Sequence, residues 1–386
     1  MLPEGWENKS IDELASVERG KFSVRPRNDP RYFGGYMPFV QTGDISGSTK
    51  FLTEYTQTLN EKGVGVSKVF PKGTILITIA ANIGETAITK FDVACPDSVV
   101  AIQPYPTEAD TLWLKEVIDT KKADLEAQAT QNAQKNINLQ VIKPLVVLTP
   151  PLPEQKKIAQ ILSTWDNAIS ATERLLENSQ QRKKALMQKL LTGKKRLPGF
   201  EGEWESHLLE DMEEMGLIEL GRGNVISKVD IEKNPGSYPI YSSSIKNQGL
   251  MGSYGHYMFD EELISWSVDG GGDFFYRPHH KFSVTNVSGY MKLNTSKLSY
   301  KFVAEQLILL HQKYAFDYQS KAHPSVIRKL YVLNVPCLSE QQAIANVLTT
   351  ADQEIDALQK RLDHLKLEKK ALMQQLLTGK RRVTLN

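Results

Sequence analysis

Residues 154–196 of this 386-residue chain read EQKKIAQILSTWDNAISATERLLENSQQRKKALMQKLLTGKKR. Residues 340–382 read EQQAIANVLTTADQEIDALQKRLDHLKLEKKALMQQLLTGKRR, and the two stretches align without a gap. About half of the aligned positions are identical, whereas the sequences that precede the two copies differ strongly. A long duplicated segment with different sequence before each copy predicts two related halves that carry different functional surfaces.

Both copies have the apolar periodicity of a coiled-coil helix. Their apolar positions are separated alternately by four and three residues, which is the spacing of a heptad seam. The same spacing also includes Thr172, Ser179 and Lys183 in the first copy, and Ala351 and Lys369 in the second. The predicted apolar seam residues are Ile158, Leu162, Trp165, Ile169, Leu176, Leu186 and Leu190 in the first copy, and Ile344, Leu348, Ile355, Leu358, Leu362, Leu365, Leu372 and Leu376 in the second.

A single helix of this length would expose its apolar seam to water. The simplest arrangement pairs the two copies as antiparallel helices; the alternative is that each helix packs on its own domain. Proline-rich segments, Pro150–Pro153 and Pro336–Ser339, precede the copies, and Gly193 and Gly379 stand where a glycine would end each helix.

The segments before the two helices predict mixed α/β domains. Apolar runs such as 73–80, 98–102, 262–268 and 281–284 have strand character and are separated by turn-forming residues. The predicted fold class is therefore α/β, with two pseudo-repeated mixed α/β domains joined by two long antiparallel coiled-coil helices. We expect domain 1 at 1–153, a central spacer helix at 154–196, domain 2 at 197–339 and a C-terminal spacer helix at 340–386.

The composition is that of an ordinary globular protein without a disulfide framework. Cys95 and Cys337 are the only cysteines, and no apolar run is long enough to suggest a membrane span. We expect no signal peptide, and we expect the protein in the cytoplasm. The formal net charge is only +2, but residues 154–196 carry 10 basic and 4 acidic side chains, so the positive surplus lies on the repeated helices.

A search for catalytic motifs favours a binding protein over an enzyme. No phosphate-binding loop of the Gly-x-x-x-x-Gly-Lys-Ser/Thr type occurs, and no Asn-Pro-Pro-Tyr or Asp-Pro-Pro-Tyr methyltransferase motif is present. Asp269 and Asp273, with two nearby histidines, form too weak a pattern to predict a metal. We therefore expect no catalytic residue, no metal and no cofactor in this chain.

Several basic and aromatic stretches have the composition of nucleic-acid contacts, although each is also compatible with a solvated loop. Arginine and lysine contact phosphates, arginine also pairs with guanine, and short polar side chains reach phosphates and base edges. The residues predicted to make such contacts are Lys21, Arg25, Arg27, Arg31, Tyr32, Ser243, Lys246, Tyr276, Arg277, His279 and Lys281.

These features together resemble the DNA-specificity subunit of type I restriction-modification systems. The resemblance rests on the helix entries Pro151–Gln155 and Leu338–Gln341, on the helix end KALMQKLLTG with its second copy KALMQQLLTG, and on domain segments. Those segments are 38–45, 70–76 and 134–137 in the first half, and 238–244, 282–288 and 320–324 in the second. The two domains look like different subtypes, so roles within one domain do not transfer to the other. Lys135 and Lys321 are the exception, because the repeat relates them directly. We expect both lysines near DNA, with Asn136 and His323 beside them; the alternative is a structural lysine before a strand.

The resemblance implies a non-catalytic protein that binds double-stranded DNA. Each target-recognition domain would read one half of a bipartite, asymmetric site, and the paired helices would set the spacer between the halves. Two modification subunits, which carry S-adenosylmethionine and methylate adenine, would dock on this chain, and restriction subunits with translocase and nuclease activity would join them. The other hypotheses are a stand-alone nucleic-acid-modifying enzyme and a coiled-coil scaffold without a DNA role.

Overall fold

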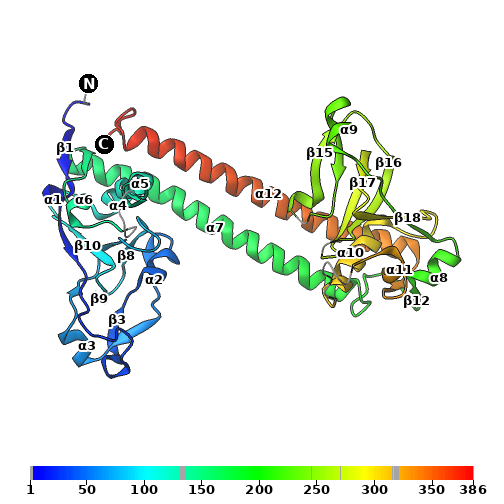
Figure 1. The fold of residues 1–386 in the computed structure, drawn as a ribbon, viewed down its shortest axis with the longest axis horizontal. Helices are drawn as coiled ribbons and strands as arrows, with labels where there is room; N and C mark the ends of the chain where they lie inside the picture. Colours follow the sequence, from blue (N-terminus) through cyan, green and yellow to red (C-terminus); the bar gives the residue numbers. More distant parts are fainter. Residues whose placement is uncertain are drawn as a thin grey trace. The chain divides into compact units, whose positions relative to one another are not determined.

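The computed structural model describes residues 3–130, 136–244, 246–269, 271–314, 316 and 321–385. The chain divides into two compact units, each built from two separate stretches of sequence (Figure 1). Unit 1 contains residues 1–171 and 362–386, and unit 2 contains residues 172–361. Each unit therefore includes one globular domain and part of both long helices.

Unit 1 is built on two small sheets and a separate two-stranded pair. The five-stranded sheet has the order β2-β10-β7-β8-β4, and the four-stranded sheet has the order β5-β3-β9-β6. Strand β1 pairs with β11 antiparallel. The strands are β1 (Glu7–Ser10), β2 (Ala15–Arg19), β3 (Phe33–Phe39), β4 (Phe51–Leu52), β5 (Gln57–Leu59), β6 (Val69–Phe70), β7 (Ile75–Thr78), β8 (Thr86–Thr89), β9 (Val93–Ala94), β10 (Val99–Pro104) and β11 (Val146–Thr149).

The helices of unit 1 cover this sheet system and join it to the long helices. Trp113 on α4 is fully buried in the main core. This core also contains Ile158 and Leu162 of the long helix α7 (Leu152–Leu190) and Leu376 of the long helix α12 (Leu338–Leu376). The domain and both long helices therefore share one apolar core in unit 1. The short elements are α1 (Ile11–Leu14), η1 (Pro30–Tyr32), α2 (Thr42–Ser46), α3 (Glu61–Gly65), α4 (Thr111–Thr120), α5 (Lys122–Thr130) and α6 (Leu139–Ile142).

Unit 2 contains one six-stranded sheet with the order β13-β18-β16-β17-β14-β15, and β12 pairs separately with β19. Strand β15 forms one edge and is connected to β14 through a hairpin. The strands are β12 (Glu205–Leu208), β13 (Ile218–Arg222), β14 (Tyr238–Tyr241), β15 (Leu250–Tyr254), β16 (Phe259–Ser267), β17 (Phe274–Val284), β18 (Ser288–Leu293) and β19 (Val332–Val335).

The core of unit 2 is organised like that of unit 1. Trp266 of β16 and Phe302 of α10 pack with Leu190 of α7 and with Ile344 and Leu348 of α12. A second, smaller aromatic cluster around Phe259 and Phe282 lies in the same unit. The short elements are α8 (Leu209–Glu214), α9 (Lys228–Lys233), η2 (Lys246–Gly249), α10 (Tyr300–His311) and α11 (Pro324–Ile327).

The long helices are α7 (Leu152–Leu190) and α12 (Leu338–Leu376), and they pair antiparallel within each unit. In unit 1 the start of α7 packs with the end of α12, and in unit 2 the end of α7 packs with the start of α12. Gly193 and Gly379 follow the two helix ends with φ of 67° and 69°, a conformation that glycine adopts without steric cost.

The predicted fold class is confirmed: two mixed α/β domains are joined by two long antiparallel helices. All the predicted apolar seam side chains are buried or half buried, and Lys183 and Lys369 are half buried too. Among the described residues, no helix combines the length and hydropathy needed to cross a membrane.

Candidate nucleic-acid interface and its support

The basic segment of unit 1 lies over a small aromatic cluster that keeps its cations at the surface. Phe22 is buried against Phe33 and Phe39, with ring centroids 5.6 and 5.0 Å away. Lys21, Arg25, Arg27 and Arg31 are exposed, and Tyr32 is half buried at the edge of the same cluster. The buried Phe22 therefore anchors a segment whose four cations lie at the surface.

Two of these cations are already paired with carboxylates. Arg27 contacts Asp97 at 2.9 Å. Hydrogen bonds from Arg31 hold the pKa of Asp29 below its usual value. Arg25 donates to the carbonyl of Val24 at 2.8 Å. Within the described part of the chain, Lys21 and Arg25 have no ion-pair partner, in contrast to Arg27 and Arg31.

The corresponding surface of unit 2 differs from the sequence expectation at Arg277. Its side chain is only 2% exposed. The guanidinium donates to Ser265 Oγ at 2.9 Å and to the carbonyl of Gln248 at 2.7 Å, and it lies 3.7 Å from the centre of the Tyr241 ring. Burial lowers the pKa of Arg277 to about 10, so the side chain is still charged at neutral pH. In this conformation Arg277 supports a surface segment from below.

The other predicted residues of unit 2 lie in three separate places. Ser243 is half buried and Lys246 is exposed, both on the β14–β15 hairpin that Arg277 supports. Lys281 lies 4.7 Å from the Tyr257 ring centre, and its neighbour His279 is exposed. Tyr276 points away from Arg277 into the main core and donates to Glu262 at 2.5 Å.

Lys135 and Lys321 are the two lysines that the repeat relates, and only Lys321 belongs to the described residues. Lys135 lies outside the described residues, and Asn136 beside it is half buried. Lys321 forms an ion pair with Asp269 at 2.8 Å. His323 caps the start of α11, because its Nδ1 accepts from the backbone N–H of Ser325. His323 therefore stabilises the start of α11, and a contact between His323 and DNA stays a prediction.

A buried glutamate at the start of each long helix joins the helices to the domain. In unit 1, Glu154 accepts from Trp6 Nε1 at 3.1 Å and from both Nε and a terminal nitrogen of Arg382 at 2.7 Å. In unit 2, Glu340 accepts from Arg196 through two bonds of 2.6 Å. Bidentate arginine–carboxylate pairs of this kind are strong and directional, so each helix start is fixed to the segment that follows the end of the other helix.

The neighbouring glutamine supplies the second half of this connection. Gln155 accepts from the backbone N–H of Asp110 and donates to the carbonyls of Glu108 and Pro150. Gln341 makes the same three kinds of bond, with Ser299, Lys297 and Pro336. The Glu-Gln dipeptide of each repeat therefore docks the helix onto the domain before it. The residue types of the motif follow from these bonds, since a buried amide can satisfy donors and acceptors together.

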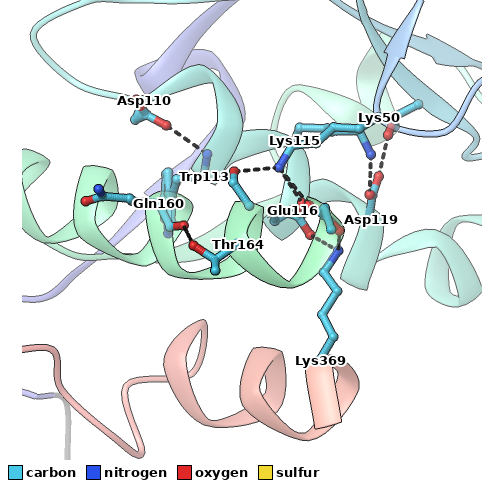
Figure 2. Close-up of polar contacts among 12 residues, drawn as sticks. Lys50, Asp110, Trp113, Lys115, Glu116, Asp119, Gln160, Thr164 and Lys369 are labelled. Carbon is cyan, nitrogen blue, oxygen red and sulfur yellow. Dashed lines mark hydrogen bonds and ion pairs between the residues drawn. The ribbon is translucent and has the colours of Figure 1, made fainter. Parts of the chain in front are cut away.

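A buried ionic cluster lies at the interrupted seam of unit 1 (Figure 2). Lys369 of α12 reaches Glu116 of α4 at 3.2 Å and Asp166 of α7 at 2.6 Å. Lys50, which precedes β4, contacts the same two carboxylates at 3.3 and 2.9 Å. We call Lys50, Glu116, Asp166 and Lys369 the first ionic cluster. It connects the sheet, the domain helix and both long helices at one point.

Unit 2 contains a second ionic cluster of the same charge pattern, Lys183, Lys301, Glu305 and Asp352. Lys183 of α7 contacts Asp352 of α12 at 2.6 Å and Glu305 of α10 at 3.2 Å. Lys301 contacts the same two carboxylates, both at 2.7 Å. The repeat relates Lys183 to Lys369 and Asp166 to Asp352. Glu116 and Glu305 are also equivalent, because each is the sixth residue of a helix whose N-cap residue donates its backbone N–H to the repeated glutamine. Only Lys50 and Lys301 come from different elements.

The charges of both clusters are mutually stabilised in spite of burial. Burial alone would lower the pKa of Lys369, but Glu116 and Asp166 outweigh it and raise the pKa above its usual value. Burial alone would raise the pKa of Asp166, but hydrogen bonds from Lys369 and Lys50 lower it. The pKa of Asp352 is lowered in the same way by Lys183 and Lys301.

The lowered pKa values of Asp166 and Asp352 predict that the protein loses stability in acid. A carboxylate with a depressed folded-state pKa contributes stability above its unfolded pKa of about 3.9, and this contribution is lost as the pH falls through the folded value. We therefore expect the urea midpoint to fall between about pH 5 and pH 3. A variant with Asp166→Asn and Asp352→Asn should show a smaller fall than the parent. An equal fall in both proteins would contradict the assignment.

Sequence reasoning missed the domain members of both clusters, Lys50, Glu116, Lys301 and Glu305. The available signal was the lysine at an apolar heptad position in each repeat, because a charge there needs a buried partner.

Within the described ranges, no group of three or more histidine, cysteine, aspartate or glutamate side chains is arranged as a metal site.

The chain matches the family model described as "Type I restriction modification DNA specificity domain" over residues 3–178 and again over residues 202–367. A putative type I restriction enzyme specificity subunit of Methanocaldococcus jannaschii is 26% identical over 418 aligned residues, covering 99% of this chain and 95% of that protein. A putative type I specificity subunit of Mycoplasma pneumoniae is 29% identical over 231 residues, covering 56% of this chain and 88% of that protein.

Solved structures share the fold at low sequence identity. The crystal structure of the S subunit of a type I restriction-modification system from M. genitalium superposes with a TM-score of 0.67 and 17% identity, covering 100% of this chain and 99% of that chain. The HsdS subunit from Thermoanaerobacter tengcongensis gives a TM-score of 0.50 at 14% identity, covering 98% of both chains. With both domains matched by the family model, the chain belongs to the non-catalytic DNA specificity subunits of type I restriction-modification systems.

Proposed function

We propose that this specificity subunit reads a bipartite, asymmetric DNA site, one half with each domain. The observation that carries the proposal is the contrast between the two units. Their helix docking is equivalent down to the Glu-Gln dipeptide and the seam lysines Lys183 and Lys369, whereas their sheets differ in strand number and order. Equivalent supports with different surfaces suit two recognition domains, at 1–153 and 197–339, that read different sequences.

The paired helices would set the spacer between the two half-sites. Two recognition surfaces held at a fixed separation accept only certain numbers of intervening base pairs, because the position along B-DNA and the helical phase change together. The spacer segments of this proposal are 154–196 and 340–386. The ionic clusters support it, since a charged residue at a single seam position specifies register.

The proposed DNA contacts differ in kind between the two domains. In the first, we assign phosphate contact to the exposed Lys21 and Arg25, with further contacts from Arg27, Arg31 and Tyr32. In the second, the proposed contacts are Ser243 and Lys246 on the supported hairpin, and His279 and Lys281 on β17. We also propose DNA contacts for the remaining predicted residues, which are Lys135, Asn136, Tyr276, Lys321 and His323.

The working complex would contain further subunits. We propose that two modification subunits, which hold S-adenosylmethionine, dock on this chain, and that restriction subunits join them in the cytoplasm. The near-neutral net charge of +2 is consistent with partner subunits that contribute part of the electrostatic affinity for DNA. No residue of this chain is assigned to the cofactor.

If each domain reads one half-site, removing cations from one domain should weaken recognition of one half-site only. Replacing both Lys21 and Arg25 by alanine removes two proposed phosphate contacts, so we expect weaker DNA binding by the assembled complex and a slope of log K against log salt that is smaller by about two. Competition with DNA carrying only one intact half-site should locate the loss in the half read by domain 1.

The test of the proposed function uses the chain assembled with its modification partner. Methylation of a DNA library with two randomised half-sites and a variable gap should return two different short sequences at one preferred gap. A single continuous motif would contradict bipartite reading. An assembled complex that retains no DNA sequence selectively would instead favour a coiled-coil scaffold.

A further inference from the structure

The hairpin between β14 and β15 ends in a strained, exposed turn. Asn247 has φ 53° and ψ 35°, and Gln248 has φ 52° and ψ 33°, so two consecutive non-glycine residues adopt the left-handed conformation. The side chains of both residues are exposed. Such backbone strain persists only where surrounding contacts determine the conformation, and it concentrates at functional sites.

The contacts that determine this turn come from the buried Arg277. Its terminal nitrogen donates to the carbonyl of Gln248 at 2.7 Å, and its Nε is fixed by Ser265 Oγ at 2.9 Å. The backbone N–H of Ser242 donates to the carbonyl of Gly249 at 2.8 Å, which closes the hairpin below the turn. The strained tip is therefore supported by the sheet through one guanidinium.

A positively charged side chain would normally be buried together with a carboxylate. Arg277 contacts hydroxyl, carbonyl and aromatic groups, and among the described residues no carboxylate forms an ion pair with it. Desolvating a charge in this way is costly, and the strain it supports adds to the cost. Neither cost is needed to connect two antiparallel strands, since a glycine-containing turn would do so without strain.

We propose that Asn247 and Gln248 read base edges in the half-site of domain 2, and that Arg277 is the residue that positions them. The inference rests on the proposed function and assigns recognition within it. Carboxamide side chains present a donor and an acceptor side by side, which matches the N6 and N7 edge of adenine in the major groove. Lys246 is exposed next to them and is placed to contact the adjacent phosphate.

Glycine substitutions separate base reading from a purely structural role of the turn. Asn247→Gly and Gln248→Gly keep the left-handed backbone accessible and remove only the side chains. We expect the assembled complex to fold and methylate DNA, with discrimination at one or two base pairs of the domain 2 half-site falling about 10- to 100-fold. Asn286→Gly, the same change at an exposed residue of another turn in unit 2, should leave discrimination unchanged.

The positioning role of Arg277 is tested by a double-mutant cycle. Arg277→Lys keeps a charge but cannot donate in the same fork geometry to Ser265 and to the Gln248 carbonyl. We expect it to lose discrimination at the same base pairs as Gln248→Gly, and the double variant to lose no more than the stronger single variant. Additive losses, or losses at other base pairs, would refute the positioning role.

The outcomes distinguish this inference from the proposed function. If the glycine variants discriminate as the parent does at every position of a bipartite site, the turn does not read bases and the bipartite model stands. If they relax both half-sites equally, domain 2 is not a separate recognition module, and the proposed function itself fails.

Discussion

Deleting one heptad from each long helix, residues 169–175 and 355–361, should shorten the preferred gap between the half-sites. Seven residues of α-helix span about 10 Å at 1.5 Å per residue, which corresponds to about three base pairs at 3.4 Å each. A whole heptad preserves the apolar seam, and the pairs Asp166–Lys369 and Lys183–Asp352 lie outside the deleted segments. The two half-site sequences should stay the same, because neither domain is altered.

The measurement is methylation by the assembled complex on DNA with fixed half-sites and a gap of variable length. Deleting the heptad from only one helix is the control, because one cluster would then be out of register with the other. We expect that protein to lose stability and activity at every gap length. An unchanged preferred gap in the double deletion would refute the spacer role of the helices.

Removing Lys369 should destabilise unit 1 more than an ordinary surface substitution would. Lys369→Leu leaves the carboxylates of Glu116 and Asp166 with only Lys50, and Glu116 is 2% exposed. Loss of one partner from a fully buried pair costs about 3–5 kcal/mol. The Lys369 side chain is 18% exposed and Lys50 stays in place. We therefore expect the free energy of unfolding, measured in urea, to fall by about 2–3 kcal/mol.

A second variant separates the lost charge from the altered packing. Asp166→Leu with Lys369→Leu removes one charge of each sign and leaves the Lys50–Glu116 pair intact. We expect this double variant to recover most of the stability lost by Lys369→Leu, since apolar replacement of a whole buried pair is close to neutral. Lys183→Leu and its double variant with Asp352→Leu give the matched experiment in unit 2. Double variants as unstable as the sum of the single changes would contradict the account.

The long helices and their antiparallel pairing could be predicted because they depend on a local pattern. The heptad spacing is visible in one copy, and its repetition in the second identifies the partner. The domains could be predicted only as mixed α/β, because their strands are short and their order depends on long-range pairing. Strand β4, for example, has two residues and pairs with β8 from another part of the chain.

The candidate site was harder to predict because charge alone does not show exposure. Arg277 reads in the sequence as a surface cation beside aromatic residues, but alternation along β17 places it under the hairpin and Tyr276 on the other face. The cluster residues Glu116 and Glu305 could not be assigned either, because they do not share the constant sequence offset that relates the long helices. Only the tertiary fold brings them to Lys369 and Lys183.

The most direct test of two different recognition domains held at a set separation is a map of methylated adenines. The DNA would come from cells that carry this protein and its modification partner. We expect one asymmetric motif of two unlike halves separated by a constant number of unspecified base pairs. A continuous or palindromic motif, or two halves at freely varying separations, would contradict the account.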